Sequence, residues 1–103
     1  MALPVRTVLV TGGRGMLART LARVLARDCS VVPADLPETD VTDPAAVEAA
    51  LAAAAPDAVV HCAAMTAVDR CETERDLAFR VNRDGTANVA RACARAGVRL
   101  VAI

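Results

Sequence analysis

A glycine-rich segment between an apolar stretch and an amphipathic stretch constrains the fold of this chain more than any other feature. Residues 5–11 are mostly β-branched and apolar, which predicts a buried strand, and Gly12-Gly13 end it. From Met16 to Arg27, apolar residues recur at helical spacing, which predicts a helix. A strand that turns directly into a helix is typical of the first unit of an α/β fold.

Two further strand–helix units follow. Asp43 and Pro44 suit the N-cap and first position of a helix that runs through an alanine-rich stretch to about Ala55 and stops at Pro56. A longer helix is expected to end at Gly97, because glycine readily adopts a left-handed backbone. The remaining predicted strands are 30–34, 58–62 and 98–103, and the longer helix covers about 74–96.

Apolar strands that alternate with helices predict a parallel sheet covered on both faces. With right-handed crossovers, the chain is expected to form the N-terminal half of a doubly wound (Rossmann) α/β sheet with strand order 3-2-1-4. No linker divides residues 1–103, so we expect a single domain.

Composition excludes several classes of protein. The chain is 55% hydrophobic, which suffices for a core, and its 12 Lys+Arg against 12 Asp+Glu lack the basic excess that nucleic-acid binding needs. No apolar run approaches the ~20 residues that span a membrane, and the N-terminus does not resemble a secretion signal. We therefore expect a cytoplasmic protein without nucleic-acid or membrane partners.

The missing residue types restrict the chemistry. The chain has no tyrosine, tryptophan or lysine, so it cannot itself supply a phenol or an ammonium group to a reaction. Its one histidine cannot form a multi-histidine metal site, and we predict no metal. The cysteines at 29, 62, 71 and 93 form no C-x-x-C pair, which favours reduced structural thiols.

The glycine-rich segment has the spacing of a phosphate-binding turn, G-x-x-G-x-x-A. Gly12 permits the tight exit from the strand, Gly15 lets a pyrophosphate approach the backbone, and Ala18 keeps the helix close to the strand. The amides of the first helical turn then face the phosphate oxygens. Purely structural turns share this spacing, so the flanking strand and helix and a correctly placed acid are needed to favour a dinucleotide.

That acid is Asp35, 23 residues after Gly12 and at the end of the second predicted strand. We expect it to accept hydrogen bonds from the adenosine ribose hydroxyls, the alternative being an ordinary loop aspartate. Arg14 lies inside the turn and suits a 2′-phosphate contact and a solvated side chain equally. Both NAD and NADP are therefore open as cofactors.

Two other groups of residues near this site have a structural interpretation that we favour. The arginines at 19, 23 and 27 share one helix face, which we interpret as solvated rather than phosphate-binding. His61 lies in the third predicted strand, where a lone histidine is more often a satisfied core residue than a general base. Neither is counted in the predicted site.

The loops after the second and third strands complete the predicted crevice. Asp40 is placed to accept from the adenine amine and Val41 to pack on the ring, although the same residues also suit plain turn chemistry before a capped helix. Small residues at 62–64 let a cofactor lie across the carboxyl ends of the strands, at a switch point between the first and fourth.

Together these segments resemble the extended short-chain dehydrogenase/reductase superfamily, and within it the dTDP-4-dehydrorhamnose reductases. The more specific mark of that branch is Ala63-Ala64-x-Thr66-Ala67-Val68-Asp69 followed by acids at 72 and 74. The resemblance covers essentially the whole chain through the segments 11–18, 40–44, 56–69 and 81–88.

The resemblance implies reduction of the 4-keto group of a nucleotide-linked 4-keto-6-deoxysugar with NADPH or NADH. Carried over by position, it implies that Gly12, Arg14, Gly15 and Met16 surround the pyrophosphate, Asp35 meets the ribose, Asp40 and Val41 the adenine, Ala63, Ala64 and Thr66 the nicotinamide side, and Asn82 positions backbone near the cofactor. The resemblance also makes a homodimer of the full-length protein possible. Members of the family often carry an acid, implicated in metal-bridged dimers, at the position of Thr20, so the metal dependence of such a dimer stays open.

The family's catalytic Ser/Thr follows the fourth strand, and its Tyr-x-x-x-Lys pair lies further on, so we assign no catalytic residue within this chain. We expect the N-terminal, cofactor-binding part of such a reductase, inactive by itself, with most of the sugar site outside it. The sequence does not separate a truncated gene product from a partial sequence. A nucleotide-sugar epimerase or dehydratase and a non-catalytic nucleotide-binding module stay open as alternatives.

Overall fold

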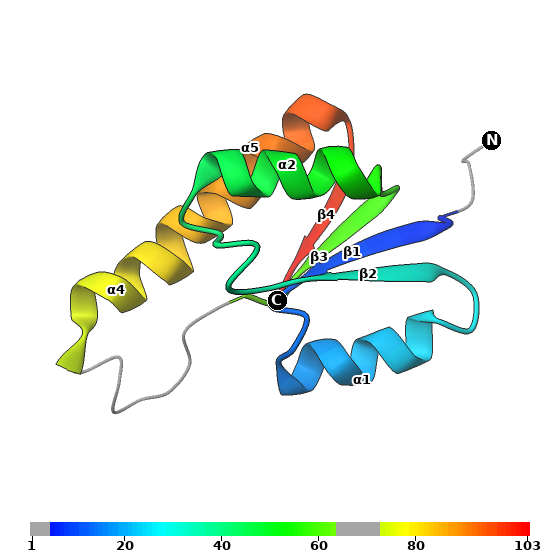
Figure 1. The fold of residues 1–103 in the computed structure, drawn as a ribbon, viewed down its shortest axis with the longest axis horizontal. Coiled ribbons are helices and arrows are strands. Elements are labelled where there is room, and N and C mark those ends of the chain that lie inside the picture. Colours follow the sequence, from blue (N-terminus) through cyan, green and yellow to red (C-terminus); the bar gives the residue numbers. More distant parts are fainter. Residues whose placement is uncertain (1–4, 64–72) are drawn as a thin grey trace.

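The computed structural model describes residues 5–63 and 73–103 and places a parallel four-stranded sheet between helices (Figure 1). The strands are β1 (Thr7–Thr11), β2 (Ser30–Ala34), β3 (Ala58–His61) and β4 (Arg99–Ala102). The helices are α1 (Met16–Leu25), α2 (Pro44–Ala54), α4 (Arg75–Phe79), the π-helix η1 (Arg80–Asp84) and α5 (Gly85–Ala96). The α/β class and all four predicted strands are confirmed.

The strand order is β2-β1-β3-β4, so the predicted order 3-2-1-4 is wrong. The third strand pairs with β1 instead of extending the sheet beyond β2, and the switch point therefore lies between β1 and β3. Pro33 supplies a physical reason. Ser30 N donates to Arg6 O (2.7 Å) and Ala34 O accepts from Gly13 N (3.3 Å), so by alternation Pro33 turns its backbone away from β1. Because proline has no N–H, that outer edge is a poor place for another strand.

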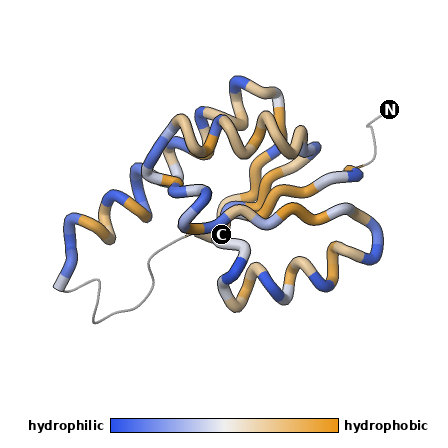
Figure 2. Tube along the Cα trace, viewed as in Figure 1, coloured by the Kyte–Doolittle hydropathy of each residue, from blue (hydrophilic) through white to orange (hydrophobic). Residues whose placement is uncertain are grey.

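Helices cover both faces of the sheet, with α1 on one side and α2 and α5 on the other (Figure 1). The core on the α2–α5 side contains Leu9, Val59 and Val89, each at most 1% exposed. The core on the α1 side is smaller and contains Val8, Val10 and Ala18. Apolar colouring runs along the strands, whereas the helices mix apolar and polar residues (Figure 2). This is the pattern expected of a sheet buried on both faces.

Local signals for the helix ends are confirmed. The Asp43 side chain accepts from Ala45 N (3.0 Å) at the start of α2, with Pro44 in the first turn. Gly97 ends α5 with a φ of 68°. Ala55 ends α2 in a left-handed conformation with a φ of 44°, one residue before Pro56. This left-handed conformation costs alanine free energy, and no local sequence signal predicts it at Ala55.

The predicted helix over 74–96 is interrupted by the π-helix η1, which separates α4 from α5. Directly after it, Gly85 lies against the chain at Val41, since an added Cβ would come within 2.7 Å of Val41 Cγ2. Asn88 Nδ2 donates to Val41 O (2.9 Å), which fixes the same contact one turn later. These two contacts hold the first turns of α5 against the loop that follows β2.

Candidate functional site: a phosphate-binding turn at the end of β1

The glycine turn closes against the end of β3. Gly12 has a φ of 65°, and a Cβ on it would lie 2.8 Å from both Cα and N of Ala63. Both constraints require glycine at this position. Gly15 N donates to Gly12 O (2.8 Å), which draws the turn into a compact cup at the carboxyl end of β1.

The N-terminus of α1 opens into this cup without a capping side chain. Its N-cap is Gly15, and no side chain in the described parts of the chain caps it. Among the described residues, a Cβ on Gly15 would meet only Gly12 O, at 3.1 Å, so these residues leave the space beyond Gly15 open. Uncapped amides beside open space form an anion site, because the N–H groups and the helix dipole both favour negative charge. These residues fit the pyrophosphate of a dinucleotide.

Asp35 is held beside the turn at the end of β2. Its Oδ2 accepts from Arg14 N (3.0 Å) and its Oδ1 from Leu36 N (2.7 Å). These two bonds fix the orientation of the carboxylate, and each oxygen retains a lone pair for a further donor. The structure thus brings Asp35 and Arg14 together, as the sequence predicts.

Gly13 is a member of the site that the glycine spacing does not mark. A Cβ on it would lie 2.5 Å from Pro33 Cβ, so the turn packs directly on β2. Its contact depends on a residue 20 positions away (33 − 13), and no local sequence signal reveals it.

A pocket of about 460 Å³ opens beside Asp35, and we call it the Asp35 pocket. The Arg14 guanidinium at its edge donates to Leu36 O and pairs with Glu38 Oε2 at 3.5 Å. Glu38 was not predicted as a site residue. The pocket is lined by Gly13, Arg14, Arg19, Pro33, Ala34, Asp35, Glu38 and Thr39.

Asp40 and Val41 occupy the loop before α2. Asp40 Oδ1 accepts from the amide (2.9 Å) and the hydroxyl (2.7 Å) of Thr42, and these bonds lower the pKa of the Asp40 carboxyl. Val41 is only 6% exposed and belongs to the core beneath α5. The structure therefore gives the Val41 side chain a packing role against Gly85, and neither residue lines the Asp35 pocket.

His61 is buried at 3% exposure and hydrogen-bonded at both ring nitrogens. Nδ1 lies 2.6 Å from Thr11 Oγ1, and Nε2 lies 3.1 Å from Thr86 Oγ1. The Thr86 hydroxyl donates to Asn82 O (2.7 Å), so it can only accept from Nε2–H. Thr11 must then donate to Nδ1, which defines a neutral ring with its proton on Nε2.

This network supports the loop after β3. Thr11 Oγ1 also accepts from Cys62 N (3.1 Å) and Ala63 N (3.3 Å), so one buried hydroxyl joins His61 to the wall of the crevice. Burial lowers the pKa of His61 and keeps it neutral near pH 7. A ring with both nitrogens occupied supports the interpretation as a satisfied core histidine.

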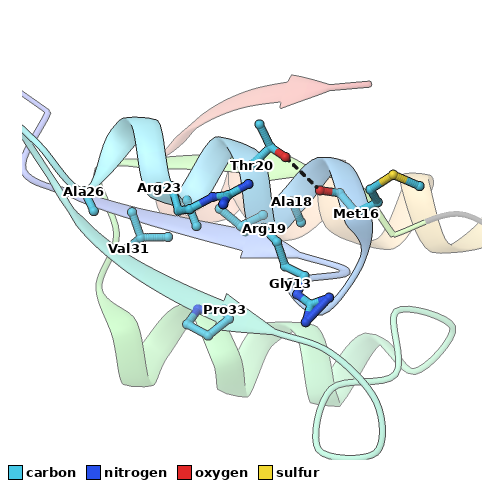
Figure 3. Close-up of a pocket in the computed structure, with 11 residues that line it drawn as sticks. Gly13, Met16, Ala18, Arg19, Thr20, Arg23, Ala26, Val31 and Pro33 are labelled. Atoms are coloured by element: carbon cyan, nitrogen blue, oxygen red, sulfur yellow. Dashed lines mark hydrogen bonds between the residues drawn. The ribbon is translucent and has the colours of Figure 1, made fainter.

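A second cleft, of about 730 Å³, lies between α1 and β2 (Figure 3). Thr20 Oγ1 donates to Met16 O (3.2 Å) within α1 beside it. We call this cleft the α1–β2 groove; it is lined by Val10, Gly13, Met16, Ala18, Arg19, Thr20, Ala22, Arg23, Ala26, Val31 and Pro33. Size alone does not make it the cofactor site, because Gly12, Gly15 and Asp35 are not among its lining residues.

Some predicted positions cannot be placed. Ala64 and Thr66, expected on the nicotinamide side, lie outside the described residues, as does Cys71. Asn82 lies in η1, and its carbonyl oxygen accepts a hydrogen bond from the Thr86 hydroxyl.

The cysteines at 29, 62 and 93 are free thiols. Within 5–63 and 73–103, no helix is both long and apolar enough to cross a membrane.

Known proteins share this sequence and fold. A dTDP-4-dehydrorhamnose reductase of Streptomyces griseus is 46% identical over 94 residues, which are 90% of this chain and 31% of the relative. A dTDP-4-dehydrorhamnose reductase of Bacillus anthracis, solved in complex with NADP, superposes with a TM-score of 0.86 at 34% identity and covers 97% of this chain and 36% of its own. For the UDP-glucose 4-epimerase of Thermus thermophilus complexed with NAD, the TM-score is 0.84 at 32% identity, over 91% of this chain and 36% of that one.

The chain spans about a third of the length of the curated relatives it matches. The family model for the RmlD substrate binding domain matches residues 6–103, nearly the entire sequence. On this match, and on a fold and glycine turn that agree with it, the chain belongs to the RmlD substrate binding domain family.

Proposed function

We propose that this chain is the NAD(P)-binding domain, residues 1–103, of a reductase that converts the 4-keto group of dTDP-4-dehydrorhamnose to the alcohol of dTDP-rhamnose. The observation that carries the proposal is the uncapped N-terminus of α1, which opens over Gly15 beside the fixed carboxylate of Asp35. The names of the relatives support the substrate, and the NADP and NAD complexes of two structural neighbours support either cofactor.

In this proposal the chain binds and orients the cofactor. The amides of the α1 N-terminus hold the pyrophosphate, with Gly12, Arg14, Gly15 and Met16 around it, and Asp35 accepts from the ribose. When bound, the nicotinamide supplies the hydride that the keto carbon receives. The Thr11–His61 network fixes the backbone at 62–63, which forms the wall nearest the switch point.

The proton for the new hydroxyl must come from outside this chain. No tyrosine or lysine is present in it, and its histidine is buried with both nitrogens engaged. Accordingly we place the proton donor, most of the sugar site and a homodimer contact in the remainder of a full-length cytoplasmic enzyme. Reduced thiols at 29, 62 and 93 are in keeping with that compartment.

The test is reduction by the full-length gene product. We expect NADPH or NADH oxidation that depends on dTDP-4-dehydrorhamnose, and loss of both turnover and cofactor binding in Gly15→Val. UDP-glucose is the comparison substrate: epimerisation of UDP-glucose without reduction of the keto sugar favours the epimerase alternative. Cofactor binding without turnover of either substrate favours the non-catalytic module.

A further inference from the structure

Arg19 is exposed, as the helical spacing predicts for this face of α1, but it also lies beside two pockets. It lines both the α1–β2 groove and the Asp35 pocket, and its side chain reaches from α1 toward the glycine turn at Gly13 (Figure 3). Arg23, one turn later on the same face, lines only the groove. The two arginines are therefore similar in sequence setting but differ in their access to the Asp35 pocket.

The two arginines that line the Asp35 pocket differ in the hydrogen bonds and ion pairs that their side chains already make. Arg14 donates to Leu36 O and pairs with Glu38 Oε2 at 3.5 Å. The side chain of Arg19 has no hydrogen bond or ion pair within the described parts of the chain. Arg19 can thus receive an anion without breaking a contact to any described residue, whereas Arg14 must first leave Glu38.

The position of Asp35 indicates which anion would bind in the Asp35 pocket. If the ribose hydroxyls meet Asp35, a 2′-substituent would lie beside that carboxylate, at the pocket that Arg14 and Arg19 also line. A 2′-phosphate there would be repelled by Asp35 and Glu38 and needs an uncommitted guanidinium to offset that repulsion.

We propose that Arg19 is the principal residue that binds the 2′-phosphate of NADP, and that Glu38 restrains Arg14 from doing so. Cofactor preference is then set by Arg19 and Glu38 together with Asp35, and Arg14 contributes only when Glu38 releases it. The proposal rests on the proposed dinucleotide binding and adds to it the two residues that discriminate between the cofactors.

Calorimetric titration of the full-length protein with NADP and with NAD tests this. For Arg19→Gln we expect NADP affinity to fall roughly tenfold to a hundredfold, the usual worth of a charge-assisted hydrogen bond. NAD affinity should change by no more than about twofold, which also shows that the variant is folded. Arg23→Gln is the matched control and should leave both affinities within about twofold of the parent.

Glu38→Gln is the second arm. Releasing Arg14 and removing a negative charge should raise NADP affinity severalfold and leave NAD affinity nearly constant. Adding Arg14→Gln to Glu38→Gln should cancel most of that gain.

The outcomes separate the two proposals. An unchanged ratio of NADP to NAD affinity in Arg19→Gln, or an equal loss in Arg23→Gln, overturns the role of Arg19 while leaving dinucleotide binding intact. A larger loss in Arg14→Gln than in Arg19→Gln overturns the restraint by Glu38. If the unmodified protein binds neither cofactor, the proposed function itself fails.

Discussion

Replacing His61 with leucine should destabilise the protein through the hydroxyl that loses its acceptor. Thr11 is 1% exposed, and its Oγ1–H has His61 Nδ1 as its acceptor at 2.6 Å. Leucine offers no acceptor, and a buried donor left unsatisfied costs about 1–3 kcal/mol. Thr86 loses less, because its hydroxyl still donates to Asn82 O.

Adding about 0.5–1.5 kcal/mol for the lost Nε2–H bond to Thr86 gives a total of about 1.5–4.5 kcal/mol. This is a large fraction of the ~5–15 kcal/mol that stabilises a typical domain. His61→Asn, which keeps one acceptor and one donor on a shorter side chain, should cost less than His61→Leu. Thr20→Val removes an exposed hydroxyl whose one hydrogen bond to the described residues is to Met16 O. It is the matched control, with an expected change within about 0.5 kcal/mol.

Urea unfolding of the full-length protein, followed by two spectroscopic probes, measures these differences. Nitrogen NMR of the imidazole, assigned by its loss in His61→Leu, should show a neutral ring protonated at Nε2. A His61→Leu variant as stable as Thr20→Val, or a ring protonated at Nδ1, would refute the proposed network.

Four further outcomes are expected. The 103-residue chain alone should show no NAD(P)H oxidation with a 4-keto-sugar nucleotide, because it lacks tyrosine and lysine; a rate clearly above the buffer blank contradicts this. Gly15→Val should abolish dinucleotide binding in calorimetry, since even a Cβ there lies 3.1 Å from Gly12 O and the remaining side chain fills the phosphate space. Burial lowers the folded-state pKa of His61 below its ordinary value of 6.5. The free energy of unfolding should therefore keep its full value above pH 6.5 and decrease as the pH falls below it, because the unfolded chain then binds more protons at this residue. His61→Leu should weaken this pH dependence in urea titrations. Asp35→Ala should shift the ratio of cofactor affinities toward NADP by about 1–3 kcal/mol, and an unchanged ratio would show that Asp35 does not contact the ribose.

The sequence by itself determined the features that depend on neighbouring residues. The strands, the start of α2 at Asp43, the end of α5 at Gly97 and the glycine turn all follow from local backbone preferences and hydrophobic spacing. These signals act within a few residues, so they can be recognised in the sequence without knowledge of the fold. The position of Asp35 next to the turn was also predicted, because consecutive parallel strands end at the same edge of a sheet.

Only the tertiary structure decided which distant residues meet. The strand order depended on the outer edge of β2 at Pro33, and the tautomer of His61 on hydroxyls 50 and 25 residues away. The pairing of Arg14 with Glu38 and the approach of Arg19 to the Asp35 pocket likewise join α1 and its glycine turn to the loop after β2. Hydrogen bonds and ion pairs across such separations form only once the sheet has set the distances, and local patterns carry no information about them.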